Sequence, residues 1–518
     1  MNWILTFVLL SLLFLLALLS LFLNRLQKSH ISLPPGPLPL PLIGHMLLAS
    51  QMTHRGLTYL ADHFTDGRGL LGLRLGHLNT LTISTPPMAK QALQIHDVVF
   101  SNRPASIAIT YLTYNRADMA FAHYGPTWRH MRKLCVTKLF SHRHKNSWFS
   151  VRREVSSTVV AIANCSGRPV CIGEMIFSLA KSIIFSAAFG SHSHGNEDLI
   201  GIIQEFSKLF GAFNIGDFFP WLRWLDLNGL NKRLKKARLE LDYFIDKIIE
   251  EHRENPKAKD DVNRDMVDEM LDFLEDTEVI AKSNFGQAEE LKNLGLTRDN
   301  IKAIIMDIMF GGIETVASAI EWAMAELMSC PNERHKVQTE LAEVVGLHRR
   351  VEESDLDKLT YLNYVVKETL RLHPPIPLAP HETADDIILD GRFVSARTRV
   401  MINIWAIGRS KSAWKDPDAF RPSRFAIGEG EAAHRDFRGS SFEFIPFGAG
   451  RRSCPGMQLG LYAMELALAE LLHCFDWELP DGMSSSELSM EDSFGLTVPR
   501  AFRLVAVPTL RLSCPLEV

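Results

Sequence analysis

The sequence has no excess of basic residues. Its 56 lysines and arginines are outnumbered slightly by 60 aspartates and glutamates, which gives a formal charge of −4. Proteins that bind nucleic acid usually carry a surplus of positive charge gathered in a patch or a stripe. We therefore expect no nucleic-acid partner.

Cysteine is scarce and scattered. Seven cysteines occur in 518 residues, the number is odd, and no two are spaced as C-x-x-C. A disulfide framework or a zinc ribbon would need closely spaced pairs. A reducing compartment fits this pattern, with most of the thiols as inert core residues. Internal repeats are also lacking, and no G-x-G-x-x-G follows a strand at the start of a helix, so the chain offers no nucleotide site of that type.

Charge is absent from residues 3 to 23, which read "WILTFVLLSLLFLLALLSLFL". As a helix this run would reach about 30 Å, the thickness of a bilayer core. Arg25 and Lys28 follow at once and nothing cationic precedes, so the body should stay on the cytosolic side. A cleaved signal peptide is the alternative, but the run is too long and no A-x-A-like site follows it. We predict an uncleaved single-pass anchor over residues 1–24.

A basic, proline-rich hinge is predicted over residues 25–45. Its second half reads "LPPGPLPLPLIGH", and proline fixes φ and favours a stiff extended path. We expect a spacer that holds the body away from the membrane at a set angle, with a generic linker as the alternative.

The remaining body, residues 46–518, is predicted to be mainly α with a minor β region. Residues 231–251 place leucine and isoleucine on one face of an amphipathic helix, and residues 300–328 form a helix that is apolar nearly all round and should cross the core. Strand-like alternation is confined to short pieces such as 70–76 and 398–407. No strong break divides this body.

The central helix carries unusual residues in its middle. Gly311 and Gly312 each cost about 1 kcal/mol relative to alanine, and Glu314 and Thr315 follow on an otherwise apolar surface. One interpretation is a tight helix crossing at the glycines with Glu314 reaching outwards. The other is a helix distorted to admit a small ligand, with an acid and a hydroxyl placed to pass protons.

Other charged pairs are weak signals when taken alone. Glu368 and Arg371 lie at i, i+3 on one helix face, which is typical of an ordinary surface ion pair. Arg424 lies in the aromatic-rich loop "FRPSRF", and Trp128 and Arg132 are one helical turn apart.

The stretch "FGAGRRSCPG", residues 447–456, surrounds Cys454 with glycines, a proline and two arginines. It fully matches the heme-binding loop of the cytochromes P450. Glu368-x-x-Arg371 with Arg424 resembles that family's ion triad, "GGIET" resembles its oxygen-activation motif, and Trp128-x-x-x-Arg132 resembles its heme-propionate helix. The five elements occur in the family's order, and the resemblance runs from about residue 34 to about residue 512.

The resemblance implies the cytochrome P450 fold, heme b as cofactor, and Cys454 as the axial thiolate ligand of the iron. It implies proton delivery by Thr315 and Glu314, and a structural triad of Glu368, Arg371 and Arg424. The heme would be bound by a further set of residues, namely Trp128, Arg132, His381, Arg452, Phe447, Gly448, Gly456 and Gly311. A separate membrane flavoprotein, the NADPH–cytochrome P450 reductase, would supply electrons at the endoplasmic reticulum, and O2 would be a substrate.

A finer resemblance concerns the plant ferulate/coniferaldehyde 5-hydroxylases of lignin synthesis. It is carried by segments such as "EFSKLFGAFNIGDF", "LTRDNIKAIIMDIMFGG" and "FEFIPFGAGRRSCPGMQLGLYA". It implies hydroxylation of a guaiacyl phenylpropanoid (coniferaldehyde, coniferyl alcohol or ferulate) beside its phenol, in a small, mostly apolar pocket.

Two departures fall in positions that we expect to line this pocket. Enzymes of that group have threonine where this chain has Ile313, and two leucines where it has Ala379-Pro380; Leu496 is a further expected pocket residue. One methylene more or less in an apolar pocket changes the discrimination between two substrates by about 1–3 kcal/mol. These departures therefore leave open another phenylpropanoid or a larger specialised metabolite as the substrate. A non-oxygenating isomerase or dehydratase of the family is a further alternative, but such relatives usually alter the acid–threonine pair, which is intact here.

Overall fold

The computed structural model describes residues 33–139, 145–190, 198–226, 229–258, 264–282, 297–428 and 430–513, together with Ser11. The predicted anchor (1–24) and the first part of the predicted hinge (25–32) lie outside these residues, Ser11 excepted.

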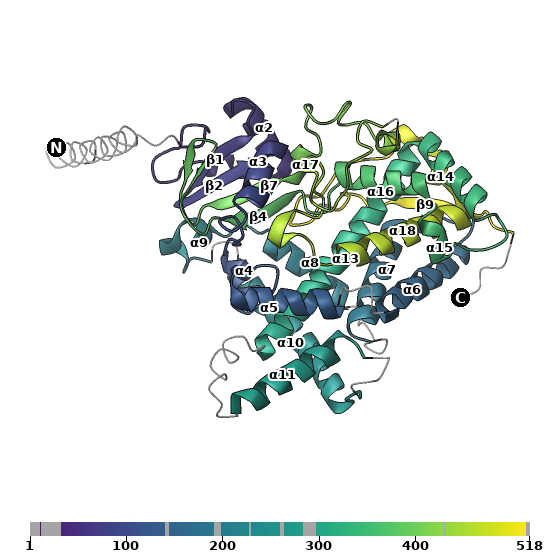
Figure 1. The fold of residues 1–518 in the computed structure, drawn as a ribbon, viewed down its shortest axis with the longest axis horizontal. Helices are drawn as coiled ribbons and strands as arrows, with labels where there is room; N and C mark the ends of the chain where they lie inside the picture. Colours follow the sequence, from purple (N-terminus) through teal and green to yellow (C-terminus); the bar gives the residue numbers. More distant parts are fainter. Residues whose placement is uncertain are drawn as a thin grey trace, which may run out of the picture.

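Helices make up most of the body (Figure 1). They are α2 (His54–Phe64), α3 (Pro86–Lys90), α4 (Ile107–Leu112), α5 (Pro126–Leu134), α6 (Lys145–Ala163), α7 (Ile172–Ala188), α8 (Asp198–Phe210), α9 (Ile215–Phe218), α10 (Leu230–Glu254), α11 (Met266–Lys282), α13 (Arg298–Ser329), α14 (Pro331–Val344), α15 (Glu353–Leu356), α16 (Thr360–Leu372), α17 (Ile404–Ile407) and α18 (Met457–Cys474). Short 3-10 or π turns lie at η1 (Met46–Gln51), η2 (Gln91–Ile95), η3 (Cys135–Leu139), η4 (Pro220–Leu222), η5 (Pro422–Phe425), η6 (Gly450–Arg452), η7 (Pro480–Gly482) and η8 (Ser485–Glu487).

The strands form three small sheets among the described residues. They are β1 (Leu70–Leu75), β2 (Leu78–Ile83), β3 (Val170–Cys171), β4 (Leu378–Glu382), β5 (Ile387–Leu389), β6 (Arg392–Val394), β7 (Arg399–Asn403), β8 (Phe475–Glu478) and β9 (Val505–Leu510). The largest sheet has the order β1-β2-β7-β4, with β2 and β7 parallel and the other pairs antiparallel. With α2, α3 and α17 it occupies one end of the molecule (Figure 1).

Helix α13 runs through the core, as the apolar pattern predicts. Its first turn is closed by a capping box, in which the Thr297 hydroxyl accepts from the Asn300 amide at 3.2 Å and the Asn300 side chain accepts from Thr297. It packs against α7, α18, α16, α10, α11 and α14. Of the described helices, α13 is the one long and apolar enough to span a membrane by length and composition, and 61% of its most apolar stretch is buried inside the protein.

One helix prediction is confirmed, and one strand prediction is wrong in length. The amphipathic helix predicted over 231–251 is α10, which buries the expected leucines and isoleucines. The strand predicted over 398–407 is too long, because β7 ends at Asn403 and α17 follows. The Asn403 side chain accepts from the Ala406 amide at 3.0 Å, and this cap starts the helical turn.

The described part of the proline-rich segment is joined to the folded body. The Gly72 amide of β1 donates to the Pro35 carbonyl at 2.7 Å. The two backbone segments approach so closely that a Cβ on Gly36 would lie 2.1 Å from the Gly72 carbonyl oxygen. The start of this segment therefore lies against the folded body, and the boundary at residue 45 stays a prediction.

Candidate functional site

The loop that carries Cys454 is a tight turn held by its own backbone. The Cys454 amide donates to the Phe447 carbonyl at 2.9 Å. Gly448 and Gly450 have φ values of +69° and +68°, a conformation that L side chains rarely adopt. A Cβ on Gly450 would also lie 2.2 Å from the Leu93 carbonyl oxygen. These two glycines are thus required by the turn and by its close contact with η2.

The Cys454 thiol faces an internal space. Its side chain is exposed, yet burial among protein atoms raises the pKa of the thiol, while the Gly456 amide and the Arg132 guanidinium act to lower it. Gly456 is the N-cap of α18, so the positive end of that helix points at the sulfur. The open side of Cys454 therefore belongs to the interior of the molecule, next to cationic and N–H groups that favour a thiolate.

Three arginines gather around this space. Among the described residues, Arg103, Arg132 and Arg452 form no ion pair with a carboxylate. Burial, together with repulsion from Arg103 and Arg132, lowers the pKa of Arg452 to about 9, and burial with repulsion from Arg132 lowers that of Arg103 to about 10. Burial and the charge of Arg103 hold the pKa of His381 well below its usual range. Such a cluster is suited to a ligand that brings carboxylates of its own.

The neighbours of these cations fix their orientation. Arg132 on α5 donates to the Ser453 carbonyl at 2.6 Å, one residue before the cysteine. The guanidinium of Arg452 lies 4.1 Å from the centre of the Trp128 ring. His381 on β4 donates through Nδ1 to the Phe100 carbonyl at 2.7 Å, which leaves Nε2 as its second polar atom.

The two glycines of α13 serve different purposes. A Cβ on Gly312 would lie 2.4 Å from Cδ1 of Ile184, so this residue permits the close crossing with α7. A Cβ on Gly311 would meet nothing within 4 Å, so this residue borders open space. Gly312 therefore fits a tight helix crossing and Gly311 fits a helix that leaves space for a small ligand, while the proton-passing role of the acid and the hydroxyl stays a prediction.

The acid and the hydroxyl follow within one turn. Thr315 Oγ1 donates to the Gly311 carbonyl at 2.5 Å. The Glu314 carboxylate is not directed only at solvent. The Ser207 hydroxyl of α8 donates a hydrogen bond to its Oε2. The residue after Thr315, Val316, lies beside Gly460 of α18. Its Cγ2 would be 3.7 Å from a Cβ placed on that glycine. This turn of α13 therefore neighbours the start of the cysteine helix.

Comparison with known proteins decides the family. A sequence model of the family described as Cytochrome P450 matches residues 34–504. The chain belongs to the cytochrome P450 family. It is 58% identical over 491 residues to Cytochrome P450 84A1 of Arabidopsis thaliana (93% of this chain, 92% of the relative) and 49% identical over 518 residues to Cytochrome P450 84A4 of Arabidopsis thaliana (97% of each). A solved zebrafish cytochrome P450 with progesterone matches 88% of this chain and 99% of its own at a TM-score of 0.73 and 25% identity.

The predicted family and fold are confirmed, and this cytochrome P450 is a monooxygenase. The identity to Cytochrome P450 84A1 also supports the finer resemblance to the ferulate/coniferaldehyde 5-hydroxylases. The family holds heme through an axial cysteine thiolate, uses O2 and a reductase, and acts on small molecules. The donor set here fits heme, because a soft sulfur ligand and unpaired cations for the two propionates border one internal space.

The predicted triad is present but is not a surface feature of this cytochrome P450. Arg371 donates to both Glu368 oxygens at 2.8 Å, and Arg424 Nε donates to Glu368 Oε1 at 2.9 Å. All three side chains are fully buried. The interpretation of Glu368 and Arg371 as an ordinary surface pair is therefore wrong. Further donation by the arginines to the carbonyls of Gly408 and Lys415 joins α16 to the loops before the cysteine segment.

The predicted pocket residues do not all face the same space. Ile313 is 0% exposed and packs within the main core cluster. It is two residues after Gly311, about 200° around the helix, so the expectation that it lines the pocket is wrong. Ala379 and Pro380 are half-buried in β4, and the Pro380 carbonyl accepts from Arg103. Leu496 is also half-buried, and its amide lies 3.6 Å from a Cβ placed on Gly211, just after α8.

Sequence reasoning missed Arg103 and a buried carboxyl pair. Asp118 lies close enough to Asp307 to add to the effect of burial in raising the pKa of Asp307. Asp307 on α13 accepts from the Met119 amide at 2.7 Å and so holds the loop that contains Asp118. Burial raises the pKa of Asp118 to about 7 and raises that of Asp307 well above its usual range. No spacing in the sequence signals either feature, although the internal position of Asp307 in an apolar helix is a weak sign.

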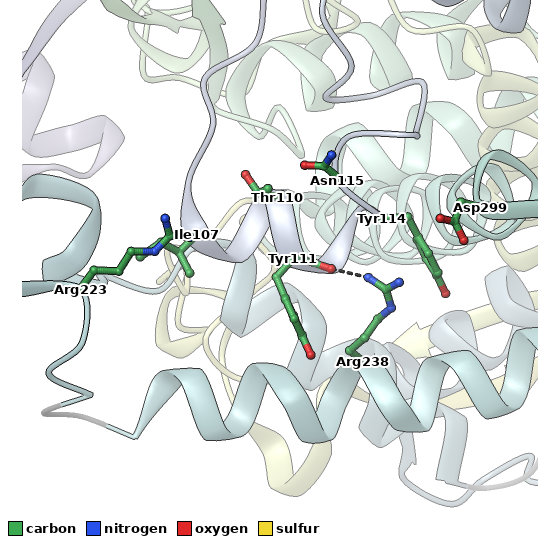
Figure 2. A pocket seen from close by; sticks show the side chains of 8 residues that line it. All are labelled: Ile107, Thr110, Tyr111, Tyr114, Asn115, Arg223, Arg238 and Asp299. Atoms are coloured by element: carbon green, nitrogen blue, oxygen red, sulfur yellow. Dashed lines mark hydrogen bonds between the residues drawn. The ribbon is translucent and has the colours of Figure 1, made fainter. Parts of the chain in front are cut away.

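A separate hollow of about 380 Å³ is lined by residues of α4, α10 and the start of α13 (Figure 2). Arg238 of α10 crosses it, donating to the Tyr111 carbonyl and placing its guanidinium carbon 3.4 Å from the centre of the Tyr114 ring. Arg223 and Asp299 also line it. None of the predicted site residues borders this hollow, so it is distinct from the space beside Cys454.

Proposed function

We propose that this monooxygenase hydroxylates the 5-position of a guaiacyl phenylpropanoid, with coniferaldehyde, coniferyl alcohol and ferulate as the candidate substrates. The observation that carries the proposal is the 58% identity to Cytochrome P450 84A1 across 93% of the chain, together with the segments that resemble the ferulate/coniferaldehyde 5-hydroxylases. A lignin or related phenylpropanoid pathway is the setting that this substrate class implies.

Cys454 is proposed as the axial ligand. Heme bound through a thiolate supplies O2 activation, because the sulfur pushes electron density towards the iron and favours O–O cleavage. The Gly456 amide and Arg132 favour the deprotonated sulfur. Arg103, Arg132 and Arg452, with Trp128 and His381 beside them, would hold the propionates by charge-assisted hydrogen bonds.

Thr315 and Glu314 are proposed to deliver protons. Thr315 Oγ1 donates to the Gly311 carbonyl beside the open space, and its single proton would pass to a bound molecule there once it leaves that carbonyl. Glu314 is the neighbouring acid, and it would return a proton to Thr315 and take one from water. The glycine at 311 keeps this part of the helix free of side-chain atoms.

The anchor is proposed to place the protein on the endoplasmic reticulum, with its catalytic domain on the cytosolic side. The support is the uncharged run of residues 3–23 followed by Arg25 and Lys28. In that location it would receive electrons from the NADPH–cytochrome P450 reductase of the same membrane.

The substrate is tested by a binding screen on membranes that contain the protein. Ferulic, coniferyl, coumaroyl and sinapyl compounds are titrated while the heme absorption is followed, and NADPH- and reductase-dependent O2 uptake is then measured with each binder. Binding and turnover of a guaiacyl compound to its 5-hydroxy product support the proposal. Turnover of a different phenolic alone would overturn the substrate, and a lack of O2 uptake with every binder would overturn the oxygenase step.

The ligand and proton roles are tested by two substitutions. Cys454→Ser should abolish the reduced carbon-monoxide band that marks heme-thiolate proteins, and a retained band would remove Cys454 as the ligand. Thr315→Ala should keep that band but divert reducing equivalents to peroxide, and unchanged coupling of NADPH use to product would discard its role.

A second candidate function is hydroxylation of another phenylpropanoid or a specialised metabolite. Ala379-Pro380 favours it, because two leucines of the resembled enzymes are replaced by a smaller and stiffer pair that is half-buried in β4. Ile313 no longer supports it, since that side chain is fully buried. Replacing Ala379-Pro380 by Leu-Leu should shift kcat/KM towards guaiacyl compounds by about tenfold if the pair sets the preference.

A further inference from the structure

Helix α8 supplies a polar partner to the acid of α13. The Ser207 hydroxyl donates to Oε2 of Glu314, and both side chains are half-buried. Among the described residues, Oε1 of Glu314 accepts no hydrogen bond. One oxygen of the carboxylate is thus held by the neighbouring helix, and the other is left open to exchange with water.

Aromatic packing sets the position of Ser207. The rings of Phe206 and Phe310 are stacked with their centres 4.8 Å apart, and Phe210 meets the same Phe310 edge-on at 6.0 Å. Phe310 and Glu314 are four residues apart and share one face of α13. The aromatic contact between α8 and α13 therefore also places Ser207, the residue after Phe206, next to the Glu314 carboxylate.

The same end of α8 adjoins the predicted substrate pocket. Phe210 stacks on Phe121, from the loop before α5, at 5.5 Å. A Cβ on Gly211, just past the end of α8, would lie 3.6 Å from the Leu496 amide. One helix therefore touches a predicted substrate contact and holds the partner of the acid.

We propose that Ser207 is a positioning residue for Glu314 in the proton delivery of the monooxygenase. Its hydroxyl fixes one carboxylate oxygen, so that the other can pass a proton to Thr315 Oγ1 and regain one from water. Without that bond the carboxylate can rotate away from Thr315, and reduced oxygen is lost as peroxide. This inference rests on the proposed role of Glu314 and adds the element that holds it in place.

The test compares Ser207→Ala with Ser207→Thr, which restores a hydroxyl at the same site. In Ser207→Ala the ratio of product to peroxide should fall by about tenfold, the size expected when a hydrogen bond to a charged group is lost. In Ser207→Thr the ratio should recover. The reduced carbon-monoxide band should be the same in both variants, which shows that the heme site is retained.

A second readout does not depend on turnover. The infrared carboxylate band of Glu314, identified by its loss in Glu314→Gln, should move in Ser207→Ala and return in Ser207→Thr. Ser186→Ala is the matched control, because it removes a serine–glutamate hydrogen bond of 2.9 Å, to Glu154, on another pair of helices. It should change neither the band nor the ratio.

The combination with Glu314→Gln separates the inference from the role of the acid. In the Glu314→Gln background, Ser207→Ala should cause no further loss of coupling, because the two residues act through one bond. An unchanged ratio and an unchanged band in Ser207→Ala alone would overturn the inference while leaving the acid in place. A second outcome would instead overturn the role of Glu314 in proton delivery. In it, Glu314→Gln leaves the product-to-peroxide ratio unchanged, although Ser207→Ala alone still shifts the carboxylate band of Glu314.

Discussion

Arg452 and Trp128 share one acceptor, the carbonyl oxygen of Met119. The indole nitrogen donates to it at 2.9 Å and Arg452 Nη1 at 3.2 Å, while the guanidinium lies over the indole ring. Arg452 also donates to the carbonyls of Ser101 and Ala122. Helix α5, the cysteine loop and the segment before α5 are thus joined at a single point beside the proposed heme site.

Replacing Arg452 by lysine should therefore weaken heme retention by about tenfold or more, because one ammonium cannot span three carbonyls and a propionate as a planar guanidinium does. Trp128→Phe keeps an aromatic ring but loses one hydrogen bond, which costs about 1 kcal/mol, and the smaller ring leaves a cavity at this buried site. The rate of heme transfer to an acceptor protein measures both effects. Arg451→Lys is the control, since Arg451 is exposed and pairs only with Asp97 and Tyr124 among the described residues; equal losses in Arg451→Lys and Arg452→Lys would contradict the assignment.

Glu368→Gln should be among the most destabilising single changes in the chain. Both Arg371 and Arg424 would be left buried without their shared carboxylate, and breaking a buried ion pair costs about 3–5 kcal/mol. The free energy of unfolding by denaturant provides the measurement. The exposed pair of Arg233 with Glu205 is the matched control, and Glu205→Gln should cost less than about 1 kcal/mol. A similar cost in the two variants would show that the triad is not a structural lock.

The Asp118–Asp307 pair should make the protein less stable as the pH rises. The folded state holds a proton on Asp118 up to about pH 7, whereas an unfolded aspartate loses its proton near pH 4. Between these values the folded state binds more protons, so the free energy of unfolding falls with increasing pH, by up to about 1.4 kcal/mol per pH unit. Asp118→Asn should flatten that slope between about pH 5 and pH 7.

The control for this slope is Asp355→Asn. A hydrogen bond from Arg349 lowers the pKa of Asp355 despite its burial, so this carboxylate is ionised throughout the range in both states. Its stabilising effect is present above about pH 4 and is lost only on acidification below that value. Asp355→Asn should lower the stability without changing the slope, and an unchanged slope in Asp118→Asn would refute the raised pKa of Asp118.

Local patterns in the sequence were sufficient where a single element carries the feature. The span of α13 follows from its apolar residues, and the cysteine turn follows from the glycines before Cys454, of which Gly448 and Gly450 have positive φ. Features that join distant segments were not accessible. The triad was predicted only through its resemblance to a family, since its burial depends on loops about 50 residues away, and Asp118 meets Asp307 only when the chain is folded. Ile313 was misplaced because the motif does not state which face of the helix turns to the ligand.

The adjacent glycines of α13 allow a matched comparison. Either alanine substitution should gain up to about 1 kcal/mol from helix propensity. Gly311→Ala meets no atom within 4 Å, so its stability should rise while the new methyl group narrows the open space and weakens substrate binding. Gly312→Ala places its Cβ 2.4 Å from Cδ1 and 2.8 Å from Cγ1 of Ile184, and overpacking of this kind costs about 1–3 kcal/mol.

The decisive combination is Gly312→Ala with Ile184→Val. The valine lacks the Cδ1 atom that the alanine would contact, so the double variant should be more stable than the sum of the single effects predicts, by about 1 kcal/mol. Denaturant unfolding of the four proteins of this cycle measures that coupling, and substrate affinity is followed in parallel. Because Gly312 faces α7 and Gly311 faces open space, Ile184→Val should rescue only Gly312→Ala. Additive effects of Gly312→Ala and Ile184→Val, or an equal rescue of Gly311→Ala by Ile184→Val, would contradict this assignment. Gly312 would then not be the glycine that permits the helix crossing, with Gly311 beside the ligand space.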